Sequence, residues 1–490
     1  MHLSLSLFFL AATLWRADAF NVRRDALSDC LAGHDVPVVM TADPGWDTAV
    51  KPYNLRLQDT IDPTIVVVAR NEADVKKAMK CAWSTKTQVS VKSGGHSYGA
   101  YGLAGTMVLD MSDFQKIAFS NGTDIVIVGA GVRLGNMAKG LYELSGRALP
   151  HGTCAGVGIG GHATLGGFGL DSRLWGLTID VVESMRVVKA DGRKALEVSA
   201  TKNAELFWGL RGAGASNFGV VTEFRLKTFV APRENTHFGY QYTFADSGKL
   251  ARALVVMQRW GLEKAPKELG YGFLLFPGGT VNLRGVYYGP KDVFETLIAP
   301  LLDELKVIYD GRVPVTTVSV KGWLESLEYL NGGPLEVPLK GYDSHDTFYA
   351  KSLVAPEDRP ISVGAASSFA AYLQFVPTTA SWYVICNLYG GPGSVINSVP
   401  ANSTSYRHRS SGYVWQFVAS GGPEANVVEY VKNMVSSFGN EIDGYPAYAP
   451  YADPELEDPQ TAYWGDNVER LRELKKVWDA DDILLNPQGF

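Results

Sequence analysis

Two glycine-rich segments constrain this chain more than any other feature. The first follows an expected strand over residues 88–92 and reads Ser93-Gly94-Gly95-His96-Ser97-Tyr98-Gly99. The second begins at Gly152-Thr153-Cys154 and continues through a train of glycines to Gly169. Glycine lets a backbone turn sharply and come close to a bound group, at a cost in conformational entropy that packing alone would not offset. We therefore expect both segments to wrap a ligand, the first one beside a pyrophosphate.

The first glycine segment carries the reactive side chain of His96, and the second carries that of Cys154. In isolation, His96 reads as an ordinary loop histidine and Cys154 as a small buried thiol. Their glycine surroundings together favour a role at the bound group instead. Cys386 differs, because it ends the apolar, strand-like run 382–386 and is expected to be a buried small hydrophobe.

A Rossmann dinucleotide site is the alternative for the ligand-binding domain. Residues 125–131 begin like the strand and turn of such a site, but Leu134 stands where a third glycine is needed. Residues 156–161 do spell G-x-G-x-x-G, yet no hydrophobic strand directly precedes them. The Rossmann fold is therefore our second choice.

The hydrophobic periodicity indicates an α+β fold of two domains. A chain of 490 residues, 46% of them hydrophobic, can bury a large core. Glycine clusters thin out near residue 230, and longer alternations typical of strands follow. We expect a first domain over 20–230, a second domain over 231–445 with an antiparallel sheet covered by helices, and a segment 446–490 that returns to the first domain. This last segment holds an amphipathic helix with Val468, Leu471, Leu474 and Val477 on one face.

The N-terminus indicates secretion. Residues 3–14 are apolar but too few to span a bilayer, and Ala17-Asp18-Ala19 has the small-x-small pattern of a signal-peptidase site. We expect a signal peptide over 1–19 and an extracellular protein; because no Lys or Arg precedes the apolar stretch, a buried first helix is the alternative. No later segment is apolar enough to anchor the chain in a membrane.

Export exposes cysteines to oxidising conditions, and Cys30 and Cys81 flank polar helical segments that a disulfide could join. The sequons at Asn121 and Asn402 are candidate glycosylation sites. The net charge of -6 comes from interspersed acids and bases, so nucleic-acid binding is not expected. We expect no metal site and a monomer.

The sequence resembles the FAD-linked oxidases of the vanillyl-alcohol oxidase type, and within them the berberine-bridge-like branch that includes glucooligosaccharide and chitooligosaccharide oxidases. The resemblance covers nearly the whole mature chain. It is carried by residues 93–98, by Gly152-Thr153-Cys154 with its glycine train, and by the segments 206–212, 218–224 and 463–467. It implies a two-domain flavoprotein with FAD in the first domain and an open groove for long substrates.

In that family a histidine bonds to the flavin 8α-methyl carbon and a cysteine to C6, roles that fall here on His96 and Cys154. The resemblance also implies FAD contacts from Ser93, Gly94, Gly95, Ser97, Val157, Gly158, Gly161, His162, Gly167, Val220 and Asn467. Val157 matches a small residue that guards oxygen access in the oxidases, which favours O2 as the electron acceptor. His162 would face the flavin pyrimidine or ribityl region as a hydrogen-bond donor.

The family's catalytic proton acceptor falls on Tyr451. Relatives support this tyrosine with an acid on a facing strand, where the present chain has Asn387, and an amide cannot accept a proton. Gln416 matches a residue that contacts the sugar in relatives, and Tyr98 and Trp382 are candidate stacking platforms for sugar rings. A strand that carries an acid in glucooligosaccharide oxidase reads here as the apolar run 271–276.

The resemblance thus predicts a carbohydrate oxidase that converts the anomeric C1 hydroxyl of an oligosaccharide to a lactone and reduces O2 to H2O2. The alternatives within enzymes are an oxidase of an aromatic or secondary-metabolite alcohol or amine, and a dehydrogenase with another acceptor. A carbohydrate-binding protein that has kept the fold and lost turnover is the non-enzymatic alternative.

Overall fold

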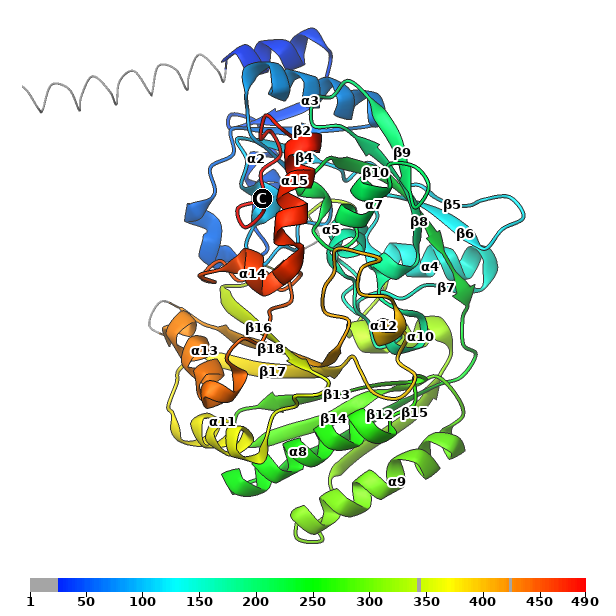
Figure 1. Cartoon of the computed structure of the whole chain (residues 1–490), viewed down its shortest axis with the longest axis vertical. Helices are drawn as coiled ribbons and strands as arrows, with labels where there is room; N and C mark the ends of the chain where they lie inside the picture. Colours follow the sequence, from blue (N-terminus) through cyan, green and yellow to red (C-terminus); the bar gives the residue numbers. More distant parts are fainter. Residues whose placement is uncertain (1–24, 342–344, 423–424) are drawn as a thin grey trace, which may run out of the picture.

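The computed structural model describes residues 25–341, 345–422 and 425–490, which form two domains stacked along the long axis of the molecule (Figure 1). The predicted signal peptide, residues 1–19, lies outside the described residues. The fold is of the α+β class, as predicted.

The first domain begins with a four-stranded sheet in the order β1-β2-β4-β3. Strands β2 and β3 both run parallel to β4, and β1 pairs antiparallel with β2. Helix α3 connects β2 to β3 and is capped at its N-terminus by Asn71, whose side chain accepts a hydrogen bond from the backbone N–H of Asp74. The bounds are β1 Val38–Met40, α2 Trp46–Ala49, β2 Ile65–Val68, α3 Glu72–Thr85, β3 Val89–Lys92 and β4 Met107–Asp110.

A five-stranded antiparallel sheet, in the order β5-β6-β10-β8-β9, completes this domain. Strand β6 contains the residues that resemble a Rossmann strand, but it pairs antiparallel on both sides, so the Rossmann alternative is wrong. The strands are β5 Ile117–Phe119, β6 Ile125–Gly129, β8 Val182–Val188, β9 Ala195–Ser199 and β10 Val220–Lys227, with β7 Arg147–Ala148 paired to β11 Phe229–Val230. The helices are α4 Leu134–Ser145, α5 Ile159–Leu165, α6 Ser172–Trp175 and α7 Ala204–Leu210.

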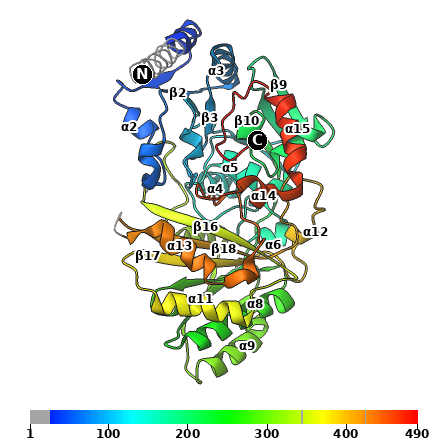
Figure 2. The ribbon, with the colours of Figure 1, turned by 60° about the vertical axis from the view of Figure 1, so that its left-hand side comes forward.

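The second domain is built on a seven-stranded antiparallel sheet in the order β15-β12-β14-β13-β17-β18-β16. Its strands are β12 Asn235–Thr243, β13 Leu269–Phe276, β14 Thr280–Tyr287, β15 Val315–Lys321, β16 Phe348–Pro356, β17 Ser381–Leu388 and β18 Ser411–Ser420. The helices of this region are α8 Ser247–Lys264, α9 Lys291–Ile308, α10 Trp323–Asn331, α11 Val363–Phe375, α12 Val395–Ser398 and α13 Val427–Ser436. Helices α8, α9 and α11 lie on the side of the sheet away from the first domain (Figure 2).

Strand alternation divides the side chains of this sheet between its two faces. On β13, Tyr271, Phe273 and Leu275 pack into the core beneath the helices. Leu274 is only half-buried and, like Gly272, takes the opposite face. The apolar run 271–276 is therefore mostly core, and little of it faces the first domain.

The C-terminal segment returns to the first domain with α14 Pro459–Trp464 and α15 Val468–Trp478 (Figure 1). Val468, Leu471 and Leu474 are buried in the core of the first domain. Val477 is 71% exposed, so its predicted place on the apolar face is wrong. Each step of three residues falls roughly 60° short of a full helical turn, and three such steps carry Val477 to the side opposite Val468.

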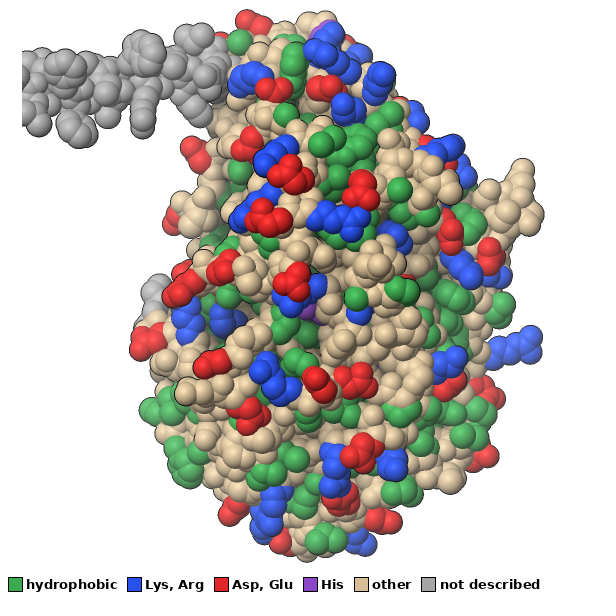
Figure 3. Space-filling model, in the orientation of Figure 1, with side chains coloured by type: hydrophobic (Ala, Val, Ile, Leu, Met, Phe, Trp, Pro, Cys, Tyr) green, Lys and Arg blue, Asp and Glu red, His purple; other side chains and the backbone are tan. Residues whose placement is uncertain are grey.

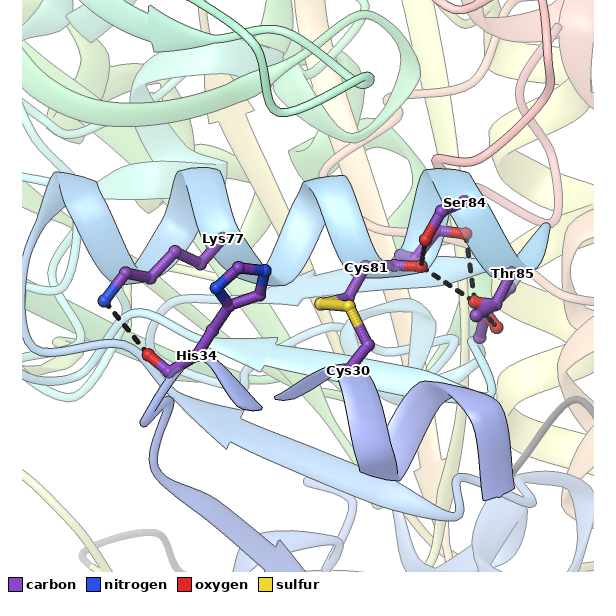
Figure 4. The surroundings of a disulfide bond; sticks show 8 residues. Cys30, His34, Lys77, Cys81, Ser84 and Thr85 are labelled. Carbon is purple, nitrogen blue, oxygen red and sulfur yellow. Dashed lines mark hydrogen bonds between the residues drawn. A yellow bond between two sulfur atoms is a disulfide. The ribbon is translucent and has the colours of Figure 1, made fainter. Parts of the chain in front are cut away.

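A disulfide joins Cys30 to Cys81, as predicted (Figure 4). It links the helical segment 25–33 to α3, and the Lys77 Nζ donates a hydrogen bond of 3.0 Å to the carbonyl oxygen of His34 alongside it. Cys386 is fully buried in the core of the second domain, in agreement with its apolar surroundings in the sequence.

Acidic and basic side chains are interspersed on the face seen in Figure 3. Asn121 and Asn402, the asparagines of the two sequons, are both exposed in turns. Among the described residues, none of the helices has the length and apolar character that crossing a membrane requires.

We predict that replacing both Cys30 and Cys81 by alanine lowers the unfolding free energy of the first domain by about 4 kcal/mol, because the disulfide closes a loop of about fifty residues. Urea unfolding followed by tryptophan fluorescence measures the change. A reductant should lower the stability of the wild type and leave the double variant unaffected. Equal stability of the two proteins without reductant would contradict the prediction.

Candidate functional site

A cavity opens in the first domain where the two glycine segments meet. The first segment leaves the end of β3, and the second leads into α5. Side chains and backbone of the C-terminal segment, from Ala449 to Gln488, close its other side. The predicted cofactor residues that line it are Ser93, Gly94, Gly95, His96, Ser97, Val157, Gly158, Gly161 and His162.

The glycines of the cavity wall are required by close contacts. A Cβ on Gly94 would lie 2.3 Å from the backbone nitrogen of Gly158, so the two segments touch through their backbones. Gly95 has a φ of +77°, in the left-handed region that favours glycine. A Cβ on Gly161 would meet no atom within 4 Å, so it would project into open space at the cavity.

A hydrogen-bonded serine fixes the junction of the two segments. The Ser93 hydroxyl donates to the Ala130 carbonyl oxygen at 2.6 Å and accepts from the Gly160 N–H at 3.3 Å. A cavity wall of glycine backbone, without side chains, suits a ligand that contains a pyrophosphate, because backbone amides can approach the phosphates closely. The lining therefore fits FAD.

His162 is a neutral imidazole. Burial lowers its pKa to about 3, and its Nε2 accepts a hydrogen bond of 3.0 Å from the Gly152 N–H. Since one nitrogen accepts, the ring proton sits on Nδ1, which makes His162 a hydrogen-bond donor at the cavity wall. This state agrees with the expected role of a donor toward a cofactor.

Of the two candidate attachment residues, His96 lines the cavity, whereas Cys154 lies close to Tyr451. The His96 ring stacks on Tyr53, with ring centroids 4.5 Å apart. The Cys154 side chain is exposed, although the surrounding protein raises the pKa of its thiol. A hydrogen bond with Thr153 and the charge of Arg284 act in the opposite direction and favour the thiolate.

Aromatic rings gather beside Cys154. Tyr98 and Tyr451 are stacked with ring centroids 5.8 Å apart, and Tyr448 meets Tyr451 edge-on at 5.1 Å. Gln416 donates a hydrogen bond of 2.9 Å from its Nε2 to the Tyr98 hydroxyl. The structure thus places Tyr98, Tyr451 and Gln416 in one cluster.

The second domain contributes the opposite wall of this site. On β17, Tyr383, Ile385 and Asn387 alternate with core residues and face the first domain. Gly272 of β13 pairs with both Asn387 and Arg284, so these three positions form one row across the sheet. The row lies on the face opposite the helices.

Burial raises the pKa of the Tyr451 hydroxyl, and the neighbouring Tyr448, Cys154 and Tyr383 raise it further. Arg284 acts in the opposite direction, because its positive charge stabilises the phenolate. Asn387 cannot take this role as a base. Among the neighbours of Tyr451, the group that favours its deprotonation is the cation Arg284, and the facing strand carries Asn387, as expected from the sequence.

Three predicted site residues lie elsewhere. Trp382 is 5% exposed and packs in the core beneath the helices, so it cannot stack on a substrate. Val220 is fully buried, and its neighbour Val221 lines the cavity instead. Asn467 lies outside the cavity and donates to the Ser405 carbonyl oxygen at 3.1 Å.

Gly167 acts through packing. Its φ is +84°, and a Cβ there would lie 2.3 Å from the Thr178 hydroxyl oxygen. The same Cβ would lie 3.0 Å from the ring of His162. Gly167 therefore lets the loop close against the back of His162 and does not line the cavity.

Sequence reasoning missed Tyr53, Tyr383 and Arg284. Arg284 had a detectable signal, since it is the one charged residue in the strand pattern of residues 280–287. Tyr383 and Tyr53 had none, because an aromatic residue in a strand or loop is more often part of a core.

Two family models match the chain. The FAD binding domain model matches residues 63–195, which contain both glycine segments. The model described as berberine and berberine like matches residues 447–490, which contain Tyr451.

Relatives match over the full length of the chain. The xylooligosaccharide oxidase of Thermothelomyces thermophilus is 32% identical, with 100% of this chain and 99% of the relative covered. The carbohydrate oxidase of Microdochium nivale is 33% identical, with 99% of each chain covered.

A solved structure of glucooligosaccharide oxidase from Acremonium strictum superposes with a TM-score of 0.87 at 30% identity, and 95% of this chain and 98% of that chain are covered. Its flavin is described as a 6-S-cysteinyl, 8α-N1-histidyl FAD.

We predict that Gly161→Val abolishes most flavin binding, because the new side chain would project into the cavity. The matched control is Gly33→Val, another helical glycine whose Cβ would meet no atom within 4 Å but which lies outside the cavity. The flavin absorbance per protein of the two purified variants is the measurement. Full flavin content in Gly161→Val would show that the cofactor does not occupy this cavity.

Proposed function

Since the chain belongs to the berberine-bridge-like family of FAD-linked oxidoreductases, we propose that it is a secreted carbohydrate oxidase that acts on the anomeric C1 hydroxyl of oligosaccharides. The observation that carries the proposal is the cluster of Tyr451, Tyr98 and Gln416 beside Cys154. The cluster combines a candidate proton acceptor, Tyr451, with a second hydroxyl from Tyr98 and an amide from Gln416.

His96 and Cys154 hold the cofactor in this proposal, through the flavin 8α carbon and C6. The Acremonium strictum enzyme, with its cysteinyl and histidyl FAD, supports this assignment. So do the positions of the two residues, one lining the cavity and the other close to Tyr451. When bound, FAD supplies a hydride acceptor for the C1 hydrogen and returns the electrons to O2, which gives H2O2.

Tyr451 removes the proton of the C1 hydroxyl as hydride leaves the carbon. Its buried site raises the pKa of the phenol, and Arg284 offsets part of this effect. The product is a lactone, which hydrolyses to an aldonic acid. Tyr98 and Gln416 are hydrogen-bonded to each other. Because the Tyr98 ring is already stacked on Tyr53 and Tyr451, the pair contacts the sugar through its polar atoms and not through the ring face.

Val157 lines the cavity, and in this proposal its small side chain is the reason that O2 is the electron acceptor. Export through the signal peptide, glycosylation at Asn121 and Asn402, and a monomeric state complete the proposal. The exposed positions of both asparagines support the glycosylation sites.

Peroxide release with a panel of gluco-, xylo- and chitooligosaccharides, set beside aromatic alcohols and amines, tests the proposed function. Turnover of sugars with O2 supports it. Turnover of the aromatic compounds alone would replace it with a secondary-metabolite oxidase. A flavin that stays oxidised during anaerobic incubation with every compound would indicate a binding protein without turnover.

We predict that Tyr451→Phe lowers kcat by roughly 100- to 10,000-fold, because the general base is lost. Steady-state assays of peroxide release, with a sugar that the wild-type enzyme oxidises, measure the change. Tyr142→Phe, at an exposed tyrosine of α4, is the matched control and should keep wild-type activity. A small effect of Tyr451→Phe would remove this residue from the mechanism.

We predict that kcat/KM rises with pH, because the base must be deprotonated and burial raises the pKa of Tyr451. Arg284→Gln should move this rise to higher pH, since the positive charge that lowers the pKa of Tyr451 is removed. The pH profiles of wild type and variant are compared with one substrate at constant ionic strength. An unchanged profile would show that Arg284 does not act on Tyr451.

A further inference from the structure

Arg284 is a cation that the described residues leave without a counter-ion. It forms no hydrogen bond or ion pair among the described residues, and burial lowers its pKa. The groups that interact with it electrostatically are Tyr329, Cys154 and Tyr451, none of which carries a carboxylate. An uncompensated charge removed from water is costly, and proteins normally pair it.

The strands around Arg284 provide space and no negative charge. Gly239 and Gly272 are its register partners on the two neighbouring strands, so neither partner has a side chain that faces Arg284. On the Gly239 side the nearest side chain is Asn282, whose Oδ1 would lie 3.4 Å from a Cβ on Gly239. The next position in the row is Asn387, whose Oδ1 would lie 2.8 Å from a Cβ on Gly272. The Asn387 amide therefore leans over Gly272, between its own strand and Arg284.

Alternation places Arg284 on the face of the proposed substrate site. Its neighbours Val281 and Leu283 are buried in the core beneath the helices, whereas Arg284 and Asn282 are half-buried on the opposite face. Arg284 also acts on both Cys154 and Tyr451, so it lies close to the reacting end of the substrate.

We propose that Arg284, with the amide of Asn387, binds a carboxylate on the substrate, so that the preferred substrates are oligosaccharides with a uronic acid unit at or next to the oxidised end. This inference rests on the proposed carbohydrate oxidation and specifies its substrate class. Guanidinium groups bind carboxylates through two parallel hydrogen bonds, and neither Gly239 nor Gly272 has a side chain that would compete for Arg284.

The test compares matched disaccharides that differ only at C6: digalacturonate with galactobiose, and the corresponding glucuronate disaccharide with cellobiose. The holoenzyme is expected to show a kcat/KM about 10- to 100-fold higher for the charged member of a pair, the range of a charge-assisted hydrogen bond. Arg284→Gln should bring this ratio close to one, and Arg284→Lys should keep part of it. Arg225→Gln, an exposed arginine of β10, is the matched control.

A second variant tests the proposal by adding a negative charge next to Arg284 instead of removing its positive charge. Asn387→Asp supplies an internal carboxylate next to Arg284 and should shift the preference toward the neutral sugars. Calorimetric titration of the Tyr451→Phe holoenzyme with each disaccharide measures binding without turnover. The charged member should bind more tightly, and this difference should disappear when Arg284→Gln is added.

The outcomes separate the two proposals. Equal losses with charged and neutral sugars in Arg284→Gln would mean that Arg284 serves Tyr451 alone, which overturns the carboxylate site. Wild-type preference for the neutral members, or turnover of neutral oligosaccharides only, would overturn it too and leave carbohydrate oxidation standing. Failure to oxidise any sugar would overturn both proposals.

Discussion

The backbone contact between the two glycine segments is the constraint on which the rest of the structure depends. Gly94 and Gly158 meet so closely that neither position has room for a Cβ. This contact joins the end of β3 to the start of α5 and leaves an open cavity with a bare backbone wall. The reactive side chains His96 and Cys154 are thereby carried by two different segments that meet at this contact.

The second constraint is the alternation of side chains in the seven-stranded sheet. One face is apolar and is covered by helices, so it forms a core that holds the sheet rigid. The other face carries Tyr383, Asn387, Gln416 and Arg284 toward the cofactor domain. Tyr451 reaches this face from the C-terminal segment, which packs on the first domain through Leu471 and Leu474. The site therefore forms only when all three parts of the chain are folded.

The sequence was sufficient for the fold class, the disulfide and most of the cofactor cavity, because glycine clusters and paired cysteines have few structural uses. It failed where the face of a strand had to be known. Residues 382–386 are apolar throughout, so their pattern could not show that Trp382 lies in the core and Tyr383 in the site. In the same way, the sequence could not show that Val220 is buried and that its neighbour Val221 lines the cavity. Arg284 stands out in the sequence as a charged residue in a strand. Its role could not be predicted, however, because that role depends on which residues of the adjacent strands lack a charge.

Peptide mass analysis of the purified protein, after acid precipitation and proteolysis, shows directly whether one flavin is held by both glycine segments at once. We expect flavin mass on the peptides that contain His96 and Cys154, joined through a single flavin. In the single variants His96→Ala and Cys154→Ala, flavin should remain on the other peptide. Flavin that is freely released from the wild type, or attached at neither residue, would show that the two segments do not hold the cofactor covalently.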